Sequence, residues 1–258
     1  MDMTNKTVVV TGGGRGIGKG ICLIFAKHGA NVVVCDINYE NAKKVADEIT
    51  STGKKSLALK IDVTSEKDAK TMVDETVKKF GRLDVLCNNA GIITMKHVED
   101  LTLDDWEKVF AVNAKGVFIC SKAVLAQMKK QGYGRIISTA SQGGKTGIPR
   151  LSHYCASKAA VILFTKTMAL ELAQTNIHVN CICPGSVETD MMSDALIMCS
   201  ELTGDSPEEC RKKWTEAVPM KYLADPEDIG KVFVFLASEY ADYMTGQAIN
   251  VTGGQEMH

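Results

Sequence analysis

The sequence lacks the features that mark several large classes of protein. Among its 258 residues only 5 are proline and 6% are aromatic, and no low-complexity tract or linker interrupts the chain. The net charge is −1, so there is no electrostatic reason to expect nucleic acid or an anionic membrane as a partner. We find no apolar run that approaches the length of a membrane span, and no basic-then-apolar leader. We therefore expect one cytoplasmic domain that covers residues 1–258.

Cysteine is the exception to this ordinary composition, but its pattern indicates no special chemistry. The 9 cysteines are an odd number and are scattered through apolar segments. The only close pair, Cys181 and Cys183, would share one face of a strand and lacks the spacing of metal ligands. We expect reduced thiols that serve as small core residues, and no bound metal.

Segments typical of strands alternate with segments typical of helices. Apolar runs at 7–10, 31–35, 56–61, 83–87, 135–139, 178–183 and 247–251 predict strands. Helical patterns occupy the stretch from the first glycines to residue 28, and then 39–50, 65–80, 106–130, 159–174 and 225–237. This alternation predicts an α/β fold with a doubly wound parallel sheet. At 187–219 the pattern loosens, and we predict a substrate-covering insertion at 190–219, although a small helical flap with an ordinary core is the simpler alternative.

A glycine-rich turn follows the first strand directly. Its glycines have the spacing Gly12-x-x-x-Gly16-x-Gly18, and Arg15 and Ile17 lie between them. Glycines let the backbone approach a pyrophosphate, which the N-terminus of the next helix would stabilise. The spacing is not G-x-G-x-x-G, and a glycine cluster alone is more often a plain turn. The strand before it and the helix after it favour a dinucleotide site.

The second strand ends at an acidic residue that bears on the choice of cofactor. Asp36 lies 18 residues beyond Gly18, where a carboxylate can accept hydrogen bonds from both ribose hydroxyls and repels a 2′-phosphate. Asp36 therefore argues for NAD over NADP. Arg15 argues weakly for NADP, because a basic side chain in the loop could meet a phosphate. We give Asp36 more weight, since its repulsion acts directly on the group that distinguishes the two cofactors.

Polar or small residues also follow the third and fourth strands. Asp62 and Val63 are placed to flank an adenine, and Asn89, Ala90 and Gly91 lie where sites of α/β proteins form. Asparagines often do no more than satisfy turn backbone, which is the alternative here. Another asparagine, Asn113, falls inside a predicted helix, where it marks either a local distortion or a water site.

A tyrosine and a lysine four residues apart, Tyr154 and Lys158, would share one face of a helix. A nearby ammonium favours phenolate, and we expect it to lower the pKa of Tyr154 from about 10 toward neutrality. Ser141 lies 13 residues upstream of Tyr154, just after a predicted strand. The spacing alone decides nothing, because Tyr39 and Lys43 repeat it in what we interpret as a surface helix. The serine, the glycines and the small residues near Tyr154 distinguish it from Tyr39.

Together these motifs resemble the short-chain dehydrogenase/reductase family over essentially the whole chain. The resemblance implies a Rossmann-like fold with a seven-stranded parallel sheet and hydride transfer to or from a nicotinamide. It implies that Tyr154 is the acid/base, that Ser141 holds the substrate oxygen, and that Lys158 lowers the tyrosine pKa and holds the nicotinamide ribose. Asn113 would position a water in a proton relay. The cofactor-contacting set would further include Pro184, Gly185, Val187 and Thr189, the last two at the nicotinamide amide.

The resemblance is less specific about the substrate and the oligomeric state. The loop 142–149 and the tail 253–258 look similar to polyol, diol and acetoin dehydrogenases of the family. We therefore predict an NAD-dependent enzyme for a small secondary alcohol or its ketone. The alternatives are a hydroxysteroid dehydrogenase, a 3-oxoacyl-carrier-protein reductase, which would ordinarily prefer NADP, and a non-catalytic NAD-binding sensor. Apolar helices at 109–128 and 159–172 and the habit of the family predict a homotetramer or homodimer.

Overall fold

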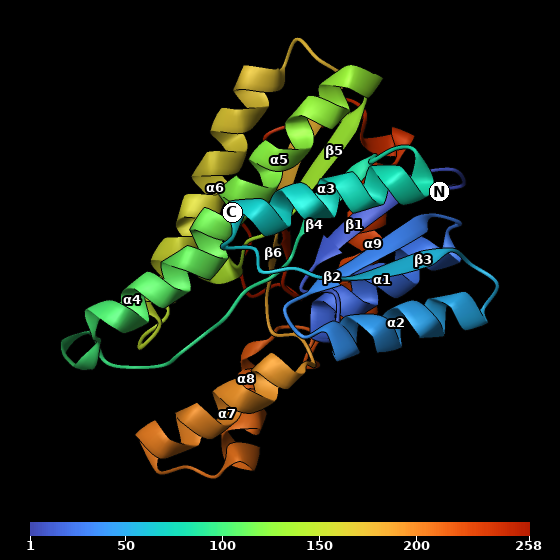
Figure 1. Cartoon of the computed structure of the whole chain (residues 1–258). Helices are drawn as coiled ribbons and strands as arrows, with labels where there is room; N and C mark the ends of the chain where they lie inside the picture. Colours follow the sequence, from blue (N-terminus) through green and yellow to red (C-terminus); the bar gives the residue numbers. More distant parts are fainter.

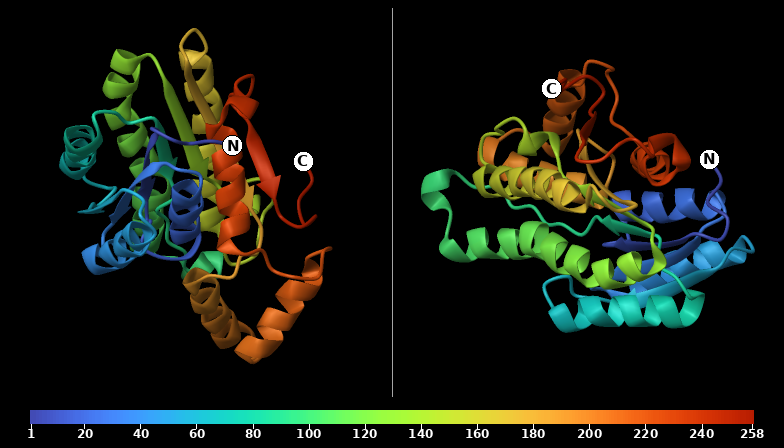
Figure 2. Two further views of the ribbon diagram at one scale, coloured as in Figure 1. Left: turned by 90° about the vertical axis from the view of Figure 1, so that its right-hand side faces the viewer. Right: turned by 90° about the horizontal axis from the view of Figure 1, so that it is seen from above.

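Seven parallel strands form one sheet in the order β3-β2-β1-β4-β5-β6-β7. Helices lie on both sides of this sheet in Figures 1 and 2. The computed structural model describes residues 1–258. The predicted α/β fold, a Rossmann-like doubly wound seven-stranded parallel sheet in a single domain, is confirmed. The strands are β1 (Thr7–Thr11), β2 (Asn31–Asp36), β3 (Ser56–Lys60), β4 (Val85–Asn88), β5 (Gly134–Thr139), β6 (Ile177–Pro184) and β7 (Ala248–Val251).

Helices cover both faces of the sheet, which explains why the strands are apolar without alternation. In β1, Val8 and Val10 pack on one helix layer while Val9 packs on the other, and all three are fully buried. The first layer contains α1 (Gly16–Lys27), α2 (Tyr39–Ser51) and α9 (Pro226–Ala237). The second contains α3 (Glu66–Phe80), α5 (Gly116–Gln131) and α6 (Ser152–Leu172).

The strand order places a crevice at the carboxyl ends of β1 and β4. The chain runs outward from β1 through β2 to β3, and then returns to β4 on the other side of β1. The connections that leave β1 and β4 therefore diverge, and a crevice opens between them. Gly12 and Asn89, which follow these two strands directly, meet there.

A distorted helical segment runs from α4 (Leu103–Phe110) through a π-helical turn at Ala111–Lys115 into α5. Asn113 lies in that turn, so the predicted local distortion is present. By length and composition the segment 103–131 could cross a membrane, and 44% of its apolar window is buried. Our expectation that no run has this length was wrong, because lysines spaced along the segment obscure its apolar character. Packing of α5 against α3 and the sheet is what a core helix also shows, so this single helix is weak evidence for a membrane.

The segment from residue 190 to 219 forms two helices, α7 (Asp190–Thr203) and α8 (Pro207–Ala217). They protrude beyond the end of the sheet, as the orange helices in Figures 1 and 2 show. A small apolar cluster of their own, which includes Leu196, Cys199 and Cys210, holds them against Met95 and Leu151. The segment therefore has the ordinary core of a helical flap, and it also contributes to the cavity described below.

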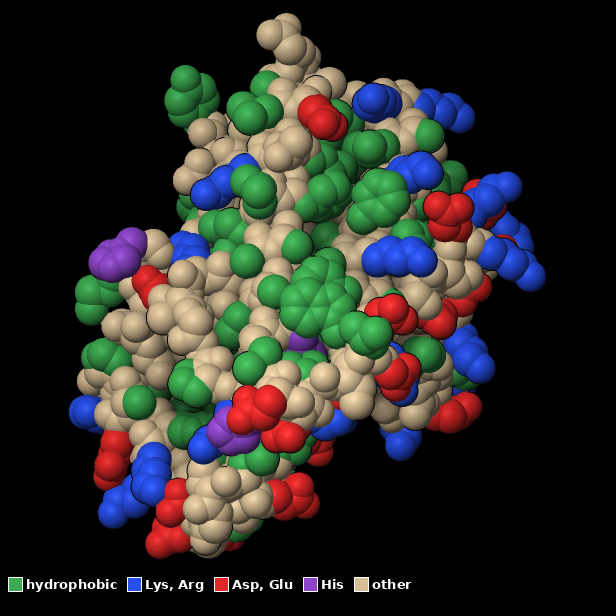
Figure 3. Space-filling model, turned by 90° about the vertical axis from the view of Figure 1, so that its left-hand side faces the viewer, with side chains coloured by type: hydrophobic (Ala, Val, Ile, Leu, Met, Phe, Trp, Pro, Cys, Tyr) green, Lys and Arg blue, Asp and Glu red, His purple; other side chains and the backbone are tan.

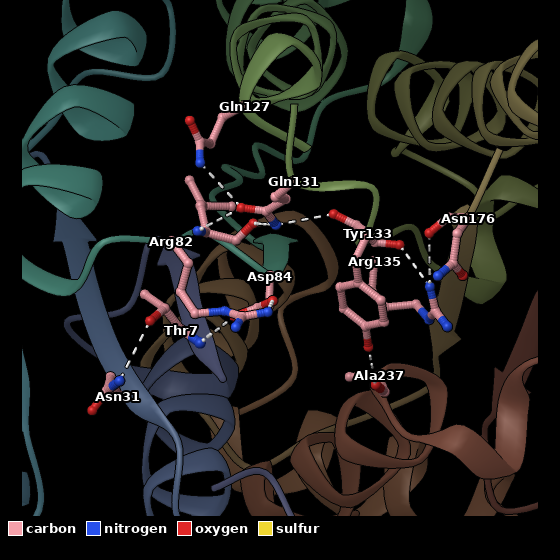
Figure 4. Close-up of polar contacts among 12 residues, drawn as sticks. Thr7, Asn31, Arg82, Asp84, Gln127, Gln131, Tyr133, Arg135, Asn176 and Ala237 are labelled. Atoms are coloured by element: carbon pink, nitrogen blue, oxygen red, sulfur yellow. Dashed lines mark hydrogen bonds and ion pairs between the residues drawn. The ribbon is translucent and has the colours of Figure 1, made fainter. Parts of the chain in front are cut away.

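At the end of the strands away from the crevice, polar side chains form the cluster of contacts that Figure 4 shows. The fully buried carboxylate of Asp84 accepts from the backbone N–H of Thr7 at 2.8 Å and from the Arg82 guanidinium through two bonds of 2.6 Å. Arg135 lies over the Tyr133 ring, 4.4 Å from its centroid, and pairs with Asp242 at 2.7 Å. The Asp84 contacts join the start of β1 to the start of β4, and Arg135 joins β5 to the segment after α9, both at the end of the sheet away from the crevice.

All nine cysteines are free thiols, and all except Cys155 are buried. No group of three or more His, Cys, Asp or Glu side chains is arranged to hold a metal ion.

Candidate active site

A cavity of about 690 Å³ occupies the carboxyl end of the sheet and extends under α7 and α8. Every site residue predicted from the sequence lines it except Gly18 and Asn113. The sequence-predicted members are Gly12, Arg15, Gly16, Ile17, Asp36, Asp62, Val63, Asn89, Ala90, Gly91, Ser141, Tyr154, Lys158, Pro184, Gly185, Val187 and Thr189. Tyr39, in contrast, is exposed on α2, and the neighbouring Lys43 pairs with Asp47.

The glycine turn is built so tightly that side chains do not fit in it. Gly12 has a φ of 61°, and a Cβ there would lie 2.8 Å from the Cα of Ala90. A Cβ on Gly18 would lie 2.0 Å from the carbonyl oxygen of Gly12, so Gly18 packs behind the turn rather than lining the cavity. The helix that follows begins at Gly16, and no side chain caps its first N–H groups. Free N–H groups above a glycine cradle fit a pyrophosphate.

The carboxylate of Asp36 is held in place by backbone donors. Its two oxygens accept from the N–H groups of Gly14 at 3.0 Å and Asn38 at 2.9 Å. A carboxylate has about four acceptor positions, so acceptor capacity remains for the hydroxyls of a ribose. This end of the cavity therefore fits the adenosine half of a dinucleotide.

Arg15 is turned away from that carboxylate. Its Nη1 lies 3.9 Å from an oxygen of Asp190, at the start of α7, and both side chains are mostly exposed. An exposed pair at this distance contributes little energy. The arginine thus lies between the glycine turn and α7, and its position gives no support to a role at a 2′-phosphate.

Three residues flank the adenosine end of the cavity. Asp62 accepts from the N–H and hydroxyl of Thr64 at 2.9 and 2.7 Å, so its carboxylate shapes the turn after β3. Val63 is buried beside it. Ile37 also lines the cavity while 65% exposed. Ile37 was not predicted from the sequence, although an apolar residue directly after Asp36 was a usable signal.

The turn after β4 is fixed by side chains from its neighbours. The Asn89 amide donates to the carbonyl of Gly12 at 3.1 Å and accepts from the Thr139 hydroxyl at 3.1 Å. The hydroxyl of Thr11 accepts from the N–H groups of Asn89 and Ala90 at 3.0 and 3.2 Å. Asn89 therefore does satisfy backbone, as the simpler interpretation held, and in doing so it fixes the glycine turn. The role of Thr11 was not predicted from the sequence.

Asn113 reaches the site from the π-helical turn without lining the cavity. It is fully buried, its oxygen accepts from the N–H of Ile92 at 2.9 Å, and its amide donates to the Ile92 carbonyl at 3.0 Å. A Cβ added to Gly91 would lie 3.3 Å from the Asn113 oxygen and 3.5 Å from the Lys158 ammonium. Gly91 thus keeps a small space open between these two polar groups.

The tyrosine, lysine and serine come together on one wall of the cavity. Tyr154 and Lys158 lie one turn apart on α6, with the ammonium 5.7 Å from the centroid of the ring. Lys158 is only 4% exposed and donates to the carbonyl of Thr139 at 2.8 Å. Ser141 follows β5, and its hydroxyl accepts from the N–H of Gly143 at 3.0 Å.

The electrostatics of this group differ from the sequence-based expectation. Burial raises the pKa of Tyr154 above its usual value, and hydrogen bonding by Ser141 offsets only part of that rise. Burial also lowers the pKa of Lys158 to about 8. Our expectation of a tyrosine pKa already lowered by Lys158 was therefore wrong for the protein without cofactor. The lysine is 5.7 Å from the ring centroid and itself desolvated, so its charge does not overcome the burial of the phenol.

The end of β6 closes the cavity from the other side. Pro184 and Gly185 line it, and a Cβ on Gly185 would lie 2.7 Å from the side-chain oxygen of Gln255. Val187 pairs with Ala224 through an isolated bridge, and Thr189 caps α7 by accepting from the N–H of Met192. These residues connect β6 to the helical flap.

Part of the remaining cavity wall comes from the segment 190–219, which was predicted to cover the substrate, and the other part was not predicted from the sequence. This remaining wall is mainly apolar and contains one arginine. Its members include Ile93, Met95, Ile148, Arg150, Leu151, Met191, Met192, Ala195, Cys199 and Trp214.

The chain belongs to the short-chain dehydrogenase family, whose model matches residues 6–198. An uncharacterized oxidoreductase of Thermotoga maritima is 40% identical over 98% of each chain. The 3-oxoacyl-[acyl-carrier-protein] reductase FabG of the same organism is 38% identical over 98% of this chain and 99% of its own. A crystal structure of NAD⁺-bound xylitol dehydrogenase matches with a TM-score of 0.95 at 34% identity, and covers 98% of this chain and 100% of its own. The protein is therefore an oxidoreductase of the dehydrogenase/reductase type.

Proposed function

We propose that the protein is an NAD-dependent enzyme that interconverts a small secondary alcohol, of the polyol or diol kind, and its ketone. The observation that carries this proposal is the shared cavity. Tyr154, Ser141 and Lys158 lie on one of its walls, and Asp36 and the glycine turn lie at its other end. This arrangement supports a proton-exchanging role for Tyr154 next to a cradle that fits a dinucleotide.

Each catalytic side chain has a distinct task in this proposal. When bound, the nicotinamide supplies the hydride acceptor or donor and, in its oxidised form, a positive charge. Tyr154 takes the alcohol proton as phenolate, or returns it to the carbonyl in the reverse direction. Ser141 donates to the developing alkoxide, which stabilises the transition state. Lys158 favours the phenolate form of Tyr154 and binds the nicotinamide ribose. A relay water would occupy the small space between Lys158 and Asn113.

The choice of NAD rests on Asp36. Its carboxylate is oriented by two backbone N–H groups and retains free acceptor positions. A 2′-phosphate would bring like charge to this position and would offer it no hydroxyl donor. Arg15 is turned toward Asp190 instead. The similar xylitol dehydrogenase is NAD⁺-bound in its crystal structure, which agrees with this proposal.

A polyol or diol is the substrate type that the similarity to xylitol dehydrogenase favours. Because the relatives include 3-oxoacyl-carrier-protein reductases, that activity is a second candidate. The apolar cavity wall beneath α7 and α8 also suits a hydroxysteroid, which is the third candidate substrate. In all three cases residues 190–219 would cover the substrate.

The experiment is a panel of polyols, vicinal diols, hydroxysteroids and 3-oxoacyl thioesters, each tested with both nicotinamide cofactors. Turnover of a polyol or diol with NAD supports the proposal. Preferred reduction of 3-oxoacyl thioesters with NADPH would replace it with the second candidate. Binding of NAD without turnover of any secondary alcohol would favour a sensor.

We also propose that the protein acts as a homotetramer or homodimer in the cytoplasm. Hydrophobic side chains gather in the middle of the face that α5 and α6 present, as Figure 3 shows. Phe118, Leu163 and Leu170 on these helices are 45%, 66% and 79% exposed. Apolar exposure of this kind is typical of a protein interface. The nine free thiols agree with a reducing compartment.

A further inference from the structure

One charged side chain on the substrate wall of the cavity has no partner of opposite charge. Six charged residues line the cavity, and they are Arg15, Asp36, Asp62, Arg150, Lys158 and Asp190. The aspartates at 36 and 62 lie at the adenosine end, and Arg15 pairs with Asp190. Lys158 is engaged with the Thr139 carbonyl beside Tyr154. Arg150 alone lies among the apolar residues that face the substrate and remains unpaired.

The contacts of Arg150 leave most of its guanidinium free. Its one side-chain hydrogen bond runs from Nε to a ring nitrogen of His97 at a long 3.4 Å, so both terminal nitrogens lack a partner. Burial raises the pKa of Cys199 on α7, and the positive charge of Arg150 offsets part of that rise. Arg150 lines the cavity together with Met192 and Cys199 of α7.

The backbone of Arg150 is in a conformation that favours glycine or asparagine. Its φ is 68°, in the left-handed region, and its carbonyl accepts from the N–H of Lys96 at 3.0 Å. Of the other two non-glycine residues with positive φ, Asn5 and Lys221, neither lines the cavity. A long cationic side chain in a strained position on a cavity wall is a reason to look for a function of that side chain.

We propose that Arg150 binds a carboxylate of the substrate, so that the enzyme acts on a hydroxylated acid and its keto acid. The planar fork of a guanidinium matches a carboxylate through two parallel hydrogen bonds. Arg150 is half-buried on a mainly apolar wall, so a carboxylate there would meet one cation and few competing polar side chains, whereas a neutral substrate would gain no ion pair from it. The inference rests on the proposed alcohol dehydrogenase function and narrows its substrate class from small alcohols to those that carry a carboxylate.

The test compares Arg150→Asn with Arg211→Gln. Asparagine tolerates a positive φ, so Arg150→Asn removes the guanidinium without adding backbone strain. Arg211 pairs with Glu188 and does not line the cavity, so Arg211→Gln controls for the loss of one positive charge near the flap. The substrates are hydroxy acids with the hydroxyl at successive positions, each matched with its primary amide, and NAD.

The wild type should favour the acids over the amides by at least about tenfold in kcat/KM. Arg150→Asn should lose about tenfold or more on the acids, mainly through KM, and little on the amides. Arg211→Gln should leave both unchanged. Equal use of acid and amide by the wild type, or an equal loss on both in Arg150→Asn, would overturn the proposal.

A binding measurement separates this inference from the proposed function. Calorimetry with simple monocarboxylates and their amides, with saturating NADH present, requires no turnover. Carboxylate binding that is lost in Arg150→Asn and kept in Arg211→Gln supports the assignment even if no alcohol is oxidised, an outcome that would refute the proposed function alone. Absence of carboxylate binding in the wild type, while some neutral alcohol is oxidised, would refute the role of Arg150 and leave the proposed function standing.

Discussion

The ammonium of Lys158 donates a hydrogen bond of 2.8 Å to the carbonyl oxygen of Thr139, at the end of β5. The hydroxyl of the same threonine donates to Asn89, whose amide donates in turn to the carbonyl of Gly12. One chain of contacts therefore joins Lys158 to the glycine turn at the other end of the cavity. Thr139 and Asn89 thus hold both the lysine and the glycine turn in place.

Lys158→Met should stabilise the fold while it abolishes activity. The pKa of Lys158 is lowered from 10.5 to about 8 because the charged form is buried. Below pH 8 the lysine is charged in both folded and unfolded states, and the full cost of burying that charge, about 3 kcal/mol, is present. Between pH 8 and 10.5 the unfolded chain binds more protons, so the cost falls as the pH rises. Urea titrations at neutral and high pH measure both effects. Equal stability of variant and wild type at pH 7 would contradict this account.

Gly91→Ala should impair turnover without impairing the fold. The added methyl group would lie 3.3 Å from the Asn113 oxygen and 3.5 Å from the Lys158 ammonium, in the space proposed for a relay water. We expect kcat to fall by about tenfold or more, with the affinity for NAD unchanged. The control is Gly147→Ala, because a Cβ at Gly147 has no neighbour within 4 Å. Steady-state kinetics measure kcat for both variants, and a cofactor titration measures their affinity for NAD. An unchanged kcat in Gly91→Ala would argue against a water in this space.

Asp36→Ala should reduce the preference for NAD. In the wild type the carboxylate should accept from two ribose hydroxyls, a charge-assisted contact of about 1.5–3 kcal/mol. We therefore expect kcat/KM for NAD to exceed that for NADP by at least about tenfold, and the difference to collapse in the variant. Arg15→Gln is the control, and it should leave the ratio near its wild-type value. If the wild type prefers NADP and the Arg15→Gln variant does not, then Arg15 rather than Asp36 determines the choice of cofactor.

Leu163→Glu should weaken the proposed assembly. Leu163 is 66% exposed on α6, within the apolar face that we assign to the interface. A buried charge without a partner opposes association strongly. Light scattering at micromolar concentration should give a multiple of 27.9 kDa for the wild type and a smaller species for the variant. A wild type that is already a monomer would rule out the assembly.

Much of the fold was predictable because its signals are local. A run such as Val8-Val9-Val10 indicates a strand buried on both faces, and Gly12 and Gly18 mark a turn in which side chains do not fit. The grouping of Ser141, Tyr154 and Lys158 followed from the order of strands and helices.

The features that could not be predicted depend on how deeply side chains are buried and on which elements pack together. Neither can be inferred from a short stretch of sequence. The sequence places Lys158 near Tyr154 but does not say how far both are desolvated, so the direction of the tyrosine pKa was mispredicted. Arg150 has no local motif. Its place on the cavity wall follows only from the packing of α7 against the neighbouring residues Ile148 and Leu151.

The most direct test of the central claim is the kinetic comparison of Tyr154→Phe with Tyr39→Phe, each measured with NAD and the best alcohol of the panel. Tyr154 lines the cavity within reach of Ser141, whereas Tyr39 is exposed on α2. Tyr154→Phe should bind NAD like the wild type and lose about 10²–10⁴-fold in kcat, and Tyr39→Phe should be nearly silent. A Tyr154→Phe enzyme that keeps most of its activity would contradict the account.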